Sequence, residues 1–316
     1  MDRPCPKRGM VIVSGSCLSP DFCMDFTRQR NMEENMNAPY QNPAIGAALA
    51  LFALALPAAA EDAPEFTVAS NVGVVSDYVS RGLQLNWGNP ALQGGVDVMH
   101  RSGWYVAAWG SQVTDNFYAG GALELDLYAG HRGSIGDALT YDAGLAAYFY
   151  PGANYRKAAP VGAYPDKRYD TTEAVFGITW RWLNLKYSHC LTDYYGYDDR
   201  TVPLSVWNSG VFGGVDAGKG TRGSGYLEAN ANFNLGDAYT LGLHAGHQSV
   251  ANSSKLSYSD YKLGMTKAFA DGWTASLAVT ATQGAELYRN FLSVAGNGKT
   301  ANVDGVHWLL GVNKAF

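Results

Sequence analysis

The residues that most resemble a catalytic pair are Ser188 and His189, which are neighbours in the sequence. Nucleophilic catalysis needs the hydroxyl and the imidazole within hydrogen-bond reach of each other. On a β-strand, adjacent side chains point to opposite faces, so these two cannot form a dyad. A nucleophile elbow is also missing, because Gly223-Ser224-Gly225 lacks the required spacing. Hydrolysis would require His189 to meet a serine of a neighbouring strand.

Metal and phosphate chemistry fit the sequence no better. His244 and His247 are three residues apart, a spacing that brings ligands together on a helix but separates them on a strand. The run 213–220 has the spacing of a phosphate loop through Lys219, yet Gly220 occupies the position of the magnesium-binding hydroxyl. We therefore expect no catalytic residues, no metal and no cofactor.

The segments that carry these residues alternate between apolar and polar side chains. From Gly272 onward, Trp273, Leu277 and Val279 share one face of a strand, while Thr274 and Thr280 share the other. About twelve such segments run from residue 66 to residue 316. The predicted strands are 66–81, 91–100, 103–113, 121–131, 138–150, 171–181, 183–193, 224–235, 238–250, 259–269, 272–282 and 305–316.

Connection lengths distinguish a membrane barrel from a soluble β-sandwich. The connections after even-numbered strands are tight, whereas 151–170, 194–223 and 283–304 are long. Short turns on one rim and long loops on the other are typical of a transmembrane barrel, and a sandwich has no reason to sort them. The sequence predicts an all-β fold, a transmembrane antiparallel up-and-down barrel of about 12 strands.

Aromatic residues gather at the ends of the predicted strands, where amphipathic rings would meet the two membrane interfaces. The outer group is Tyr78, Tyr148, Phe149, Tyr150, Tyr194, Tyr195, Tyr226, Tyr261 and Trp308. The inner group is Trp104, Trp180, Trp182, Tyr239, Phe269, Trp273 and Phe316. We expect outer-membrane lipid as the surroundings of the barrel.

The N-terminal region divides into two parts. Residues 44–60 form an apolar run that ends in Ala58-Ala59-Ala60, which is typical of a signal peptide cleaved at Ala60/Glu61. A start at Met32 or Met36 would give this signal a normal distance from the N-terminus. The expected division is an upstream extension over 1–35, a signal peptide over 36–60 and the barrel over 61–316.

Charge and cysteine content agree with this interpretation. The formal net charge is -5, and removal of residues 1–60 takes away as many basic as acidic groups. There is no basic patch that would attract nucleic acid. Three of the four cysteines precede residue 60, so only Cys190 would remain and no intramolecular disulfide could form.

Several short motifs resemble a known family. They are Ser76-Asp77-Tyr78 with Arg81-Gly82, the run 90–95, Gly103-Trp104-Tyr105, the run 148–152 and the run 260–264. Together they resemble the TorF family of proteobacterial porins, over about 66–316. The resemblance implies an outer-membrane barrel with a diffusion-pore role, and it implies no catalytic residue and no particular substrate. Tyr261 stands where tryptophan is expected, and 194–223 is longer than expected.

Strand parity predicts which charged residues line the lumen. They are Asp97, Glu124, Asp126, Asp142, Glu173, Arg181, Lys186, Glu228 and Lys262. An excess of carboxylates over cations should favour cations modestly. The expected function is passive diffusion of small hydrophilic solutes or ions. The alternative is a plugged structural or adhesive barrel whose long outer loops bind partners, because twelve strands enclose a lumen of intermediate width.

Two further features complete the prediction. The long connection 194–223 carries aromatic residues that could fold over the mouth as a constriction, namely Tyr194, Tyr195, Tyr197, Trp207 and Phe212. Phe316 ends the last strand on the same parity as Trp308, Leu310 and Val312. This pattern predicts an assembly signal read by the barrel-assembly machinery.

Overall fold

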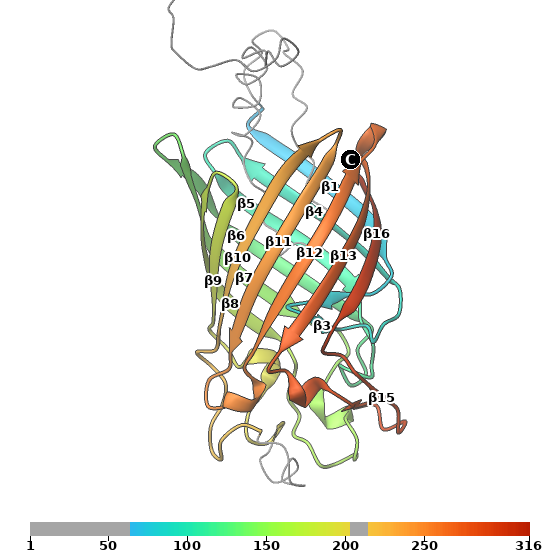
Figure 1. Ribbon diagram of the computed structural model, residues 1–316. Helices are drawn as coiled ribbons and strands as arrows, with labels where there is room; N and C mark the ends of the chain where they lie inside the picture. Colours follow the sequence, from blue (N-terminus) through green and yellow to red (C-terminus); the bar gives the residue numbers. More distant parts are fainter. Residues whose placement is uncertain (1–63, 203–213) are drawn as a thin grey trace, which may run out of the picture. The chain divides into compact units, whose positions relative to one another are not determined.

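Twelve strands form a closed antiparallel barrel in a computed structural model that describes residues 64–202 and 214–316 (Figure 1). The barrel strands are β1 (Phe66–Val75), β4 (Ala91–His100), β5 (Trp104–Gln112), β6 (Leu123–Ile135), β7 (Leu139–Phe149), β8 (Thr171–Trp180), β9 (Leu183–Cys190), β10 (Gly225–Gly236), β11 (Tyr239–Ser249), β12 (Tyr258–Ala268), β13 (Trp273–Gln283) and β16 (His307–Ala315). The predicted fold class is confirmed.

Each barrel strand pairs with its neighbours in the chain, and β1 pairs with β16 to close the ladder. The N–H of Phe316 donates to the carbonyl of Ser70 at 2.9 Å, which extends this seam to the last residue. Closure leaves no free sheet edge, because every barrel strand has a partner strand on both sides.

The connections divide into two sets. One end of the barrel, the turn end, carries the short connections 101–103, 136–138, 181–182, 237–238 and 269–272. The other end, the loop end, carries the connections 76–90, 113–122, 150–170, 191–224, 250–257 and 284–306. Figure 1 shows the loop-end connections gathered beyond the strands at the end opposite the C-terminus.

Short elements lie within the connections. They are the strands β2 (Val79–Ser80), β3 (Leu83–Gln84), β14 (Phe291–Leu292) and β15 (Thr300–Ala301), and the 3-10 turns η1 (Tyr155–Lys157), η2 (Tyr194–Gly196), η3 (Ser254–Leu256), η4 (Ala270–Gly272) and η5 (Glu286–Tyr288). Within residues 64–202 and 214–316, none of the helical segments has the length and hydropathy of a membrane-spanning helix.

The first strand differs from its prediction. Its predicted end was residue 81, but β1 ends at Val75 and the chain folds back as the hairpin β2–β3. Arg81 has a positive φ of 45° and Gly82 one of 79°, which places the tight turn of this hairpin at these two residues. The segment 76–90 that contains this hairpin is called the hairpin segment below.

The outer face of the barrel is apolar, and exposed aromatic side chains form a belt on it at the turn end. The predicted inner group is exposed at the turn end, including Trp104, Trp273 and Phe316. The predicted outer group is largely wrong. Its buried members, which belong to the interior, are Tyr78, Tyr150, Tyr194, Tyr195 and Tyr226. Tyr261 and Trp308 do lie on the exposed face.

Candidate functional site in the barrel lumen

Most of the predicted lumenal residues lie on the strand face opposite the exposed apolar side chains. These are Asp97, Glu124, Asp126, Asp142, Glu173, Lys186, Glu228 and Lys262. Arg181 differs. It lies exposed in the turn between β8 and β9 with φ of 54°, and its guanidinium lies 5.1 Å from the ring centre of Trp180. The alternation of side chains along a strand does not extend into a turn, so the prediction that Arg181 lines the lumen is wrong.

The turn half of the lumen holds a cavity of about 190 Å³. Its wall includes Arg132, Asp142 and Lys186. The Nε atom of Arg132 donates to Asp142 Oδ2 at 2.8 Å, and the Tyr105 hydroxyl donates to Asp142 Oδ1 at 2.8 Å. This half of the lumen is therefore polar, charged and large enough to hold water.

A polar network crosses four strands on the wall from β9 to β12. Lys186 forms an ion pair with Glu228, and the Asn230 amide donates to Glu228 at 3.1 Å. His244 links this pair to Asp260, with Nε2 2.9 Å from Asp260 Oδ1 and Nδ1 2.7 Å from Asn230 Oδ1. Linked charged groups of this kind hold their side chains in place on the inner wall.

Arg81 crosses the lumen from the hairpin segment to the opposite wall. Its guanidinium donates twice to Glu173 on β8, at 2.6 and 2.9 Å, and once to Gln248 on β11 at 2.9 Å. It also lies 4.5 Å from the ring centre of Tyr226. In the closed barrel order, β8 lies five strands from β1 in one direction and seven in the other, so β1, which precedes the hairpin segment, and β8 lie on nearly opposite walls. Arg81 therefore acts as a strut across the lumen.

Gly82 seats the tip of the hairpin segment against the barrel wall. A Cβ atom built on Gly82 would lie 2.6 Å from the Cβ atom of Asp260 and 2.6 Å from a methyl carbon of Thr282. Glycine alone can approach the wall this closely while adopting a positive φ. Gly82 therefore has two roles. It forms the turn from which Arg81 crosses the lumen, and it packs closely against the barrel wall.

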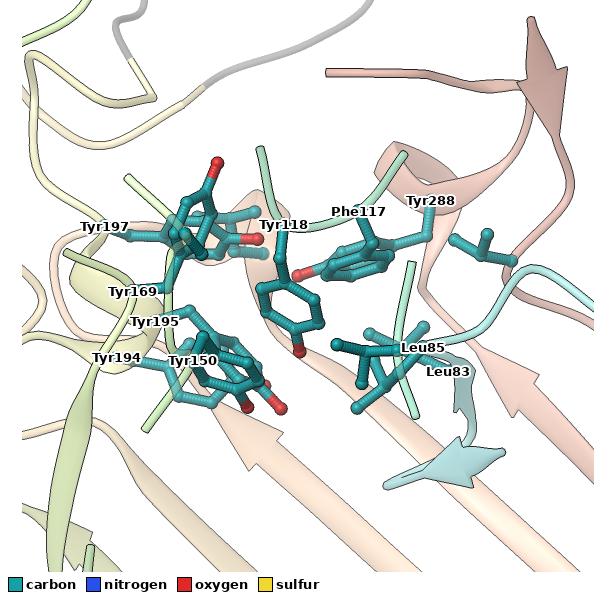
Figure 2. Close-up of a cluster of buried hydrophobic side chains, with 14 of the residues drawn as sticks. Leu83, Leu85, Phe117, Tyr118, Tyr150, Tyr169, Tyr194, Tyr195, Tyr197 and Tyr288 are labelled. Carbon is teal, nitrogen blue, oxygen red and sulfur yellow. The ribbon is translucent and has the colours of Figure 1, made fainter. Parts of the chain in front are cut away.

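Buried aromatic side chains fill the loop end, and we call them the aromatic cap. They are Phe117, Tyr118, Tyr150, Tyr155, Tyr169, Tyr194, Tyr195, Tyr197, Tyr288 and the partly buried Phe291. Figure 2 labels most of the cap, without Tyr155 and Phe291, together with Leu83 and Leu85 of the hairpin segment. The ring centres of Tyr118 and Tyr150 are 4.0 Å apart, and those of Phe117 and Phe291 are 5.1 Å apart.

The cap joins connections from different parts of the barrel rim. Tyr118 lies between β5 and β6, and its ring contacts Tyr195 of the connection between β9 and β10 at 6.0 Å. Burial, together with the neighbouring hydroxyl of Tyr195, raises the pKa of Tyr118 well above its usual range, so this hydroxyl stays protonated. The cap is thus a neutral, packed layer over the loop end of the lumen.

Three of the predicted constriction residues belong to this cap, namely Tyr194, Tyr195 and Tyr197. Trp207 and Phe212 lie outside the described residues. The sequence pattern did not reveal the contributions of Tyr118, Tyr150 and Tyr288. Their only signal was an aromatic residue in or beside a long connection, which also suits an interfacial belt.

Two carboxylates lie beneath the cap on β6. Glu124 and Asp126 are each 2% exposed. The Tyr150 hydroxyl donates to Glu124 Oε1 at 3.1 Å, and the Tyr128 hydroxyl donates to Asp126 Oδ2 at 2.8 Å. The second oxygen of each carboxylate has no hydrogen-bond partner within the described part of the chain.

The candidate catalytic and metal-binding side chains do not lie together in the structure. His189 pairs across the ladder with Ala174 and Gly225, so neither directly paired neighbour is a serine. His244 belongs to the lumenal network, whereas the ring of His247 is 2.9 Å from the Ser259 hydroxyl. Across residues 64–202 and 214–316, no group of three or more His, Cys, Asp or Glu side chains could hold a metal ion.

Comparison with known proteins gives one family. Residues 59–316 match the model of a family described as "Bacterial protein of unknown function (Gcw_chp)". No curated protein matches the chain. The matched model is not that of the TorF family, which the sequence motifs resemble.

Solved structures of other barrels are similar over most of the chain. The KdgM porin is 7% identical, with 78% of this chain and 99% of that chain covered and a TM-score of 0.44. The NanC porin is 11% identical, with 78% and 98% covered and a TM-score of 0.45. OpdK of Pseudomonas aeruginosa, solved with vanillate, is 14% identical, with 72% and 56% covered and a TM-score of 0.35.

Proposed function

The chain belongs to the Gcw_chp family of bacterial proteins, and we propose that its barrel lies in a bacterial outer membrane as a narrow channel for small hydrophilic solutes. The exposed apolar face with its aromatic belt at the turn end suits lipid. Delivery to this membrane would follow cleavage at Ala60/Glu61 and use the barrel-assembly machinery. The turn end would face the periplasm and the loop end the outside.

The charged inner wall is the observation that carries the proposal. Buried ion pairs add little stability compared with apolar packing of the same volume. The lumen nevertheless holds Arg81 with Glu173, Arg132 with Asp142 and Lys186 with Glu228. Such a wall is useful where water and polar solutes pass, because it replaces part of their hydration.

The aromatic cap makes the described conformation the closed state of this channel. Passage at the loop end would require the cap or the hairpin segment to move. The hairpin segment is the better candidate, because a single side chain, that of Arg81, attaches it to the far wall. Its other contacts at the cap are apolar: Tyr78, Leu83 and Leu85 belong to the buried cluster, and Trp87 packs against Phe291.

The wall should favour cations modestly. Glu124 and Asp126 accept hydrogen bonds from tyrosine hydroxyls, whereas Glu173, Asp142 and Glu228 are each paired with a cationic side chain. The carboxylates beneath the cap therefore leave a negative potential at the loop end of the lumen, and low-dielectric walls strengthen it.

A second candidate function is a plugged structural or adhesive barrel whose loops bind external partners. The packed aromatic cap favours it, since ten aromatic side chains close the loop end. Liposome swelling with a panel of sugars, amino acids and organic acids separates the two. The channel predicts swelling that falls with solute size, and the plugged barrel predicts none from protein whose heat-modifiable gel mobility shows that it is folded.

A further inference from the structure

The carboxylates beneath the cap leave an incomplete hydrogen-bonding arrangement. Glu124 Oε2 and Asp126 Oδ1 are buried and have no partner among residues 64–202 and 214–316. Buried polar atoms are almost always paired in native structures, and an unpaired charged group is costly to bury. The two side chains are also two residues apart on one strand face, so their like charges repel each other.

A third buried oxygen without a hydrogen-bond partner lies in the cap above them. The Tyr118 hydroxyl is fully buried and has no partner in the described part of the chain. Its ring stacks on Tyr150 at 4.0 Å, and the Tyr150 hydroxyl donates to Glu124. In Figure 2 the hydroxyl of Tyr118 lies between Tyr150 and Leu85. Glu124 is close enough to this hydroxyl to act on it electrostatically.

The groups around the carboxylates do not supply the missing positive charge, because the Tyr78 and Tyr150 hydroxyls beside Glu124 are neutral donors. Arg81 interacts with both carboxylates only at longer range, because its guanidinium is bound to Glu173 and Gln248. A metal ion is a poor occupant, since the site offers two carboxylates and no group of three ligating side chains exists among the described residues. The missing component is a cation that brings its own hydrogen-bond donors.

We propose that Glu124, Asp126 and Tyr118 form a binding site for the ammonium group of a small organic amine. A primary ammonium carries three N–H donors, and the site offers three unpartnered oxygens. Hydrogen bonds from an ammonium to carboxylates are among the strong ones. The tyrosine rings at the cap add a surface on which a cation is favoured.

This proposal deepens the proposed channel function, because it names a class of solute, and it rests on that function only for the passage of the amine. Calorimetry measures the affinity of methylammonium for the folded protein in detergent, with protein and ligand equilibrated overnight. This tests binding without any measurement of current. The same measurement with tetramethylammonium, which has the charge but no N–H donor, tests the hydrogen-bonding requirement. A failure of conduction would leave this result untouched.

The variants Glu124→Gln and Asp126→Asn should each weaken methylammonium binding at least tenfold, and Tyr118→Phe should weaken it severalfold. Asp97→Asn, which removes a lumenal carboxylate on β4, should leave it unchanged. Tetramethylammonium should bind at least tenfold more weakly than methylammonium. The absence of methylammonium binding to folded protein would overturn the proposal and indicate that the two carboxylates share a proton instead. A loss of methylammonium affinity in Asp97→Asn equal to that in Glu124→Gln and Asp126→Asn would also overturn the proposal.

Discussion

Arg81 is the residue on which the lumenal arrangement depends most. It is 15% exposed at the side chain, and its partner Glu173 is 1% exposed. Although burial lowers it, the carboxylate of Glu173 holds the pKa of Arg81 well above its usual value, so the strut is charged at every relevant pH. Because its guanidinium is held in place, Arg81 limits the width of the lumen and contributes a fixed positive charge to the electrostatic field inside it.

Replacing Arg81 with Gln should destabilise the barrel by about 3–5 kcal/mol, because Glu173 would remain buried without its cation. Adding Glu173→Gln should recover more than half of that loss, since no uncompensated charge then remains. Urea unfolding in detergent measures both. Equal stability of the single and double variants would show that the ion pair contributes no coupling.

Asp198 fixes the connection between β9 and β10 through Lys167, which donates to Asp193 at 2.7 Å and to Asp198 at 2.8 Å. Although burial raises it, the hydrogen bonds from Lys167 and from two backbone N–H groups lower the pKa of Asp198 from 3.8 to about 2. The folded state therefore binds fewer protons here than the unfolded state.

The stability contributed by Asp198 should be complete above about pH 4 and should disappear as the pH falls through about 2. Hydrogen exchange of the segment 191–202 over this range measures it. In Asp198→Asn the segment should exchange faster at neutral pH and should lose this pH dependence. Unchanged pH dependence in the variant would assign the effect to another carboxylate.

At the scale of elements, the hairpin segment shows where sequence patterning succeeds and where it stops. All twelve barrel strands followed from alternation, because each must present one face to an apolar medium and one to the lumen. Alternation continues through Val79 and Arg81, so it could not reveal that the chain turns inward at Val75. The contact of Arg81 with Glu173, 92 residues away, depends on that turn.

The sequence does not distinguish the aromatic cap from an interfacial belt, for a related reason. An aromatic residue at a strand end suits either an interfacial belt or a layer of packed loops, and the sequence does not show which way a long connection folds. At the turn end the connections are too short to fold inward, and there the prediction of an exposed belt, including Trp104 and Trp273, is correct.

Gly82→Val should raise channel conductance or open probability, because its side chain would collide with Asp260 and Thr282 and push the hairpin segment off the wall. Gly88→Val is the matched control. Gly88 has a similar φ of 73°, but its nearest neighbour is the flexible Gln84 amide at 3.7 Å. An equal effect of both substitutions would locate the gate outside this contact.

At the scale of the whole molecule, closure of the barrel depends on the last residue. Phe316 is exposed at the turn end, and its N–H donates to Ser70 across the seam between β1 and β16. Lys314 lies 5.4 Å from its ring centre and 5.9 Å from that of Trp273, which accounts for a lysine among apolar neighbours.

Deletion of Phe316 should lower the outer-membrane yield strongly, because it removes both a seam hydrogen bond and the terminal aromatic residue expected to be read during assembly. Phe269→Ala, at another exposed aromatic of the turn end, should have a small effect. Quantitative blotting of outer-membrane fractions measures both. Normal insertion of the deletion variant would contradict an assembly role for Phe316.

The proposed channel is closed in the described conformation, and its wall is charged. Single-channel recording in planar bilayers, with protein shown to be folded by heat-modifiable gel mobility, tests this most directly. We predict brief current steps above the lipid background, and a reversal potential under a salt gradient that indicates a modest preference for cations. The absence of current steps from both the native chain and Gly82→Val would contradict the channel and favour the plugged barrel.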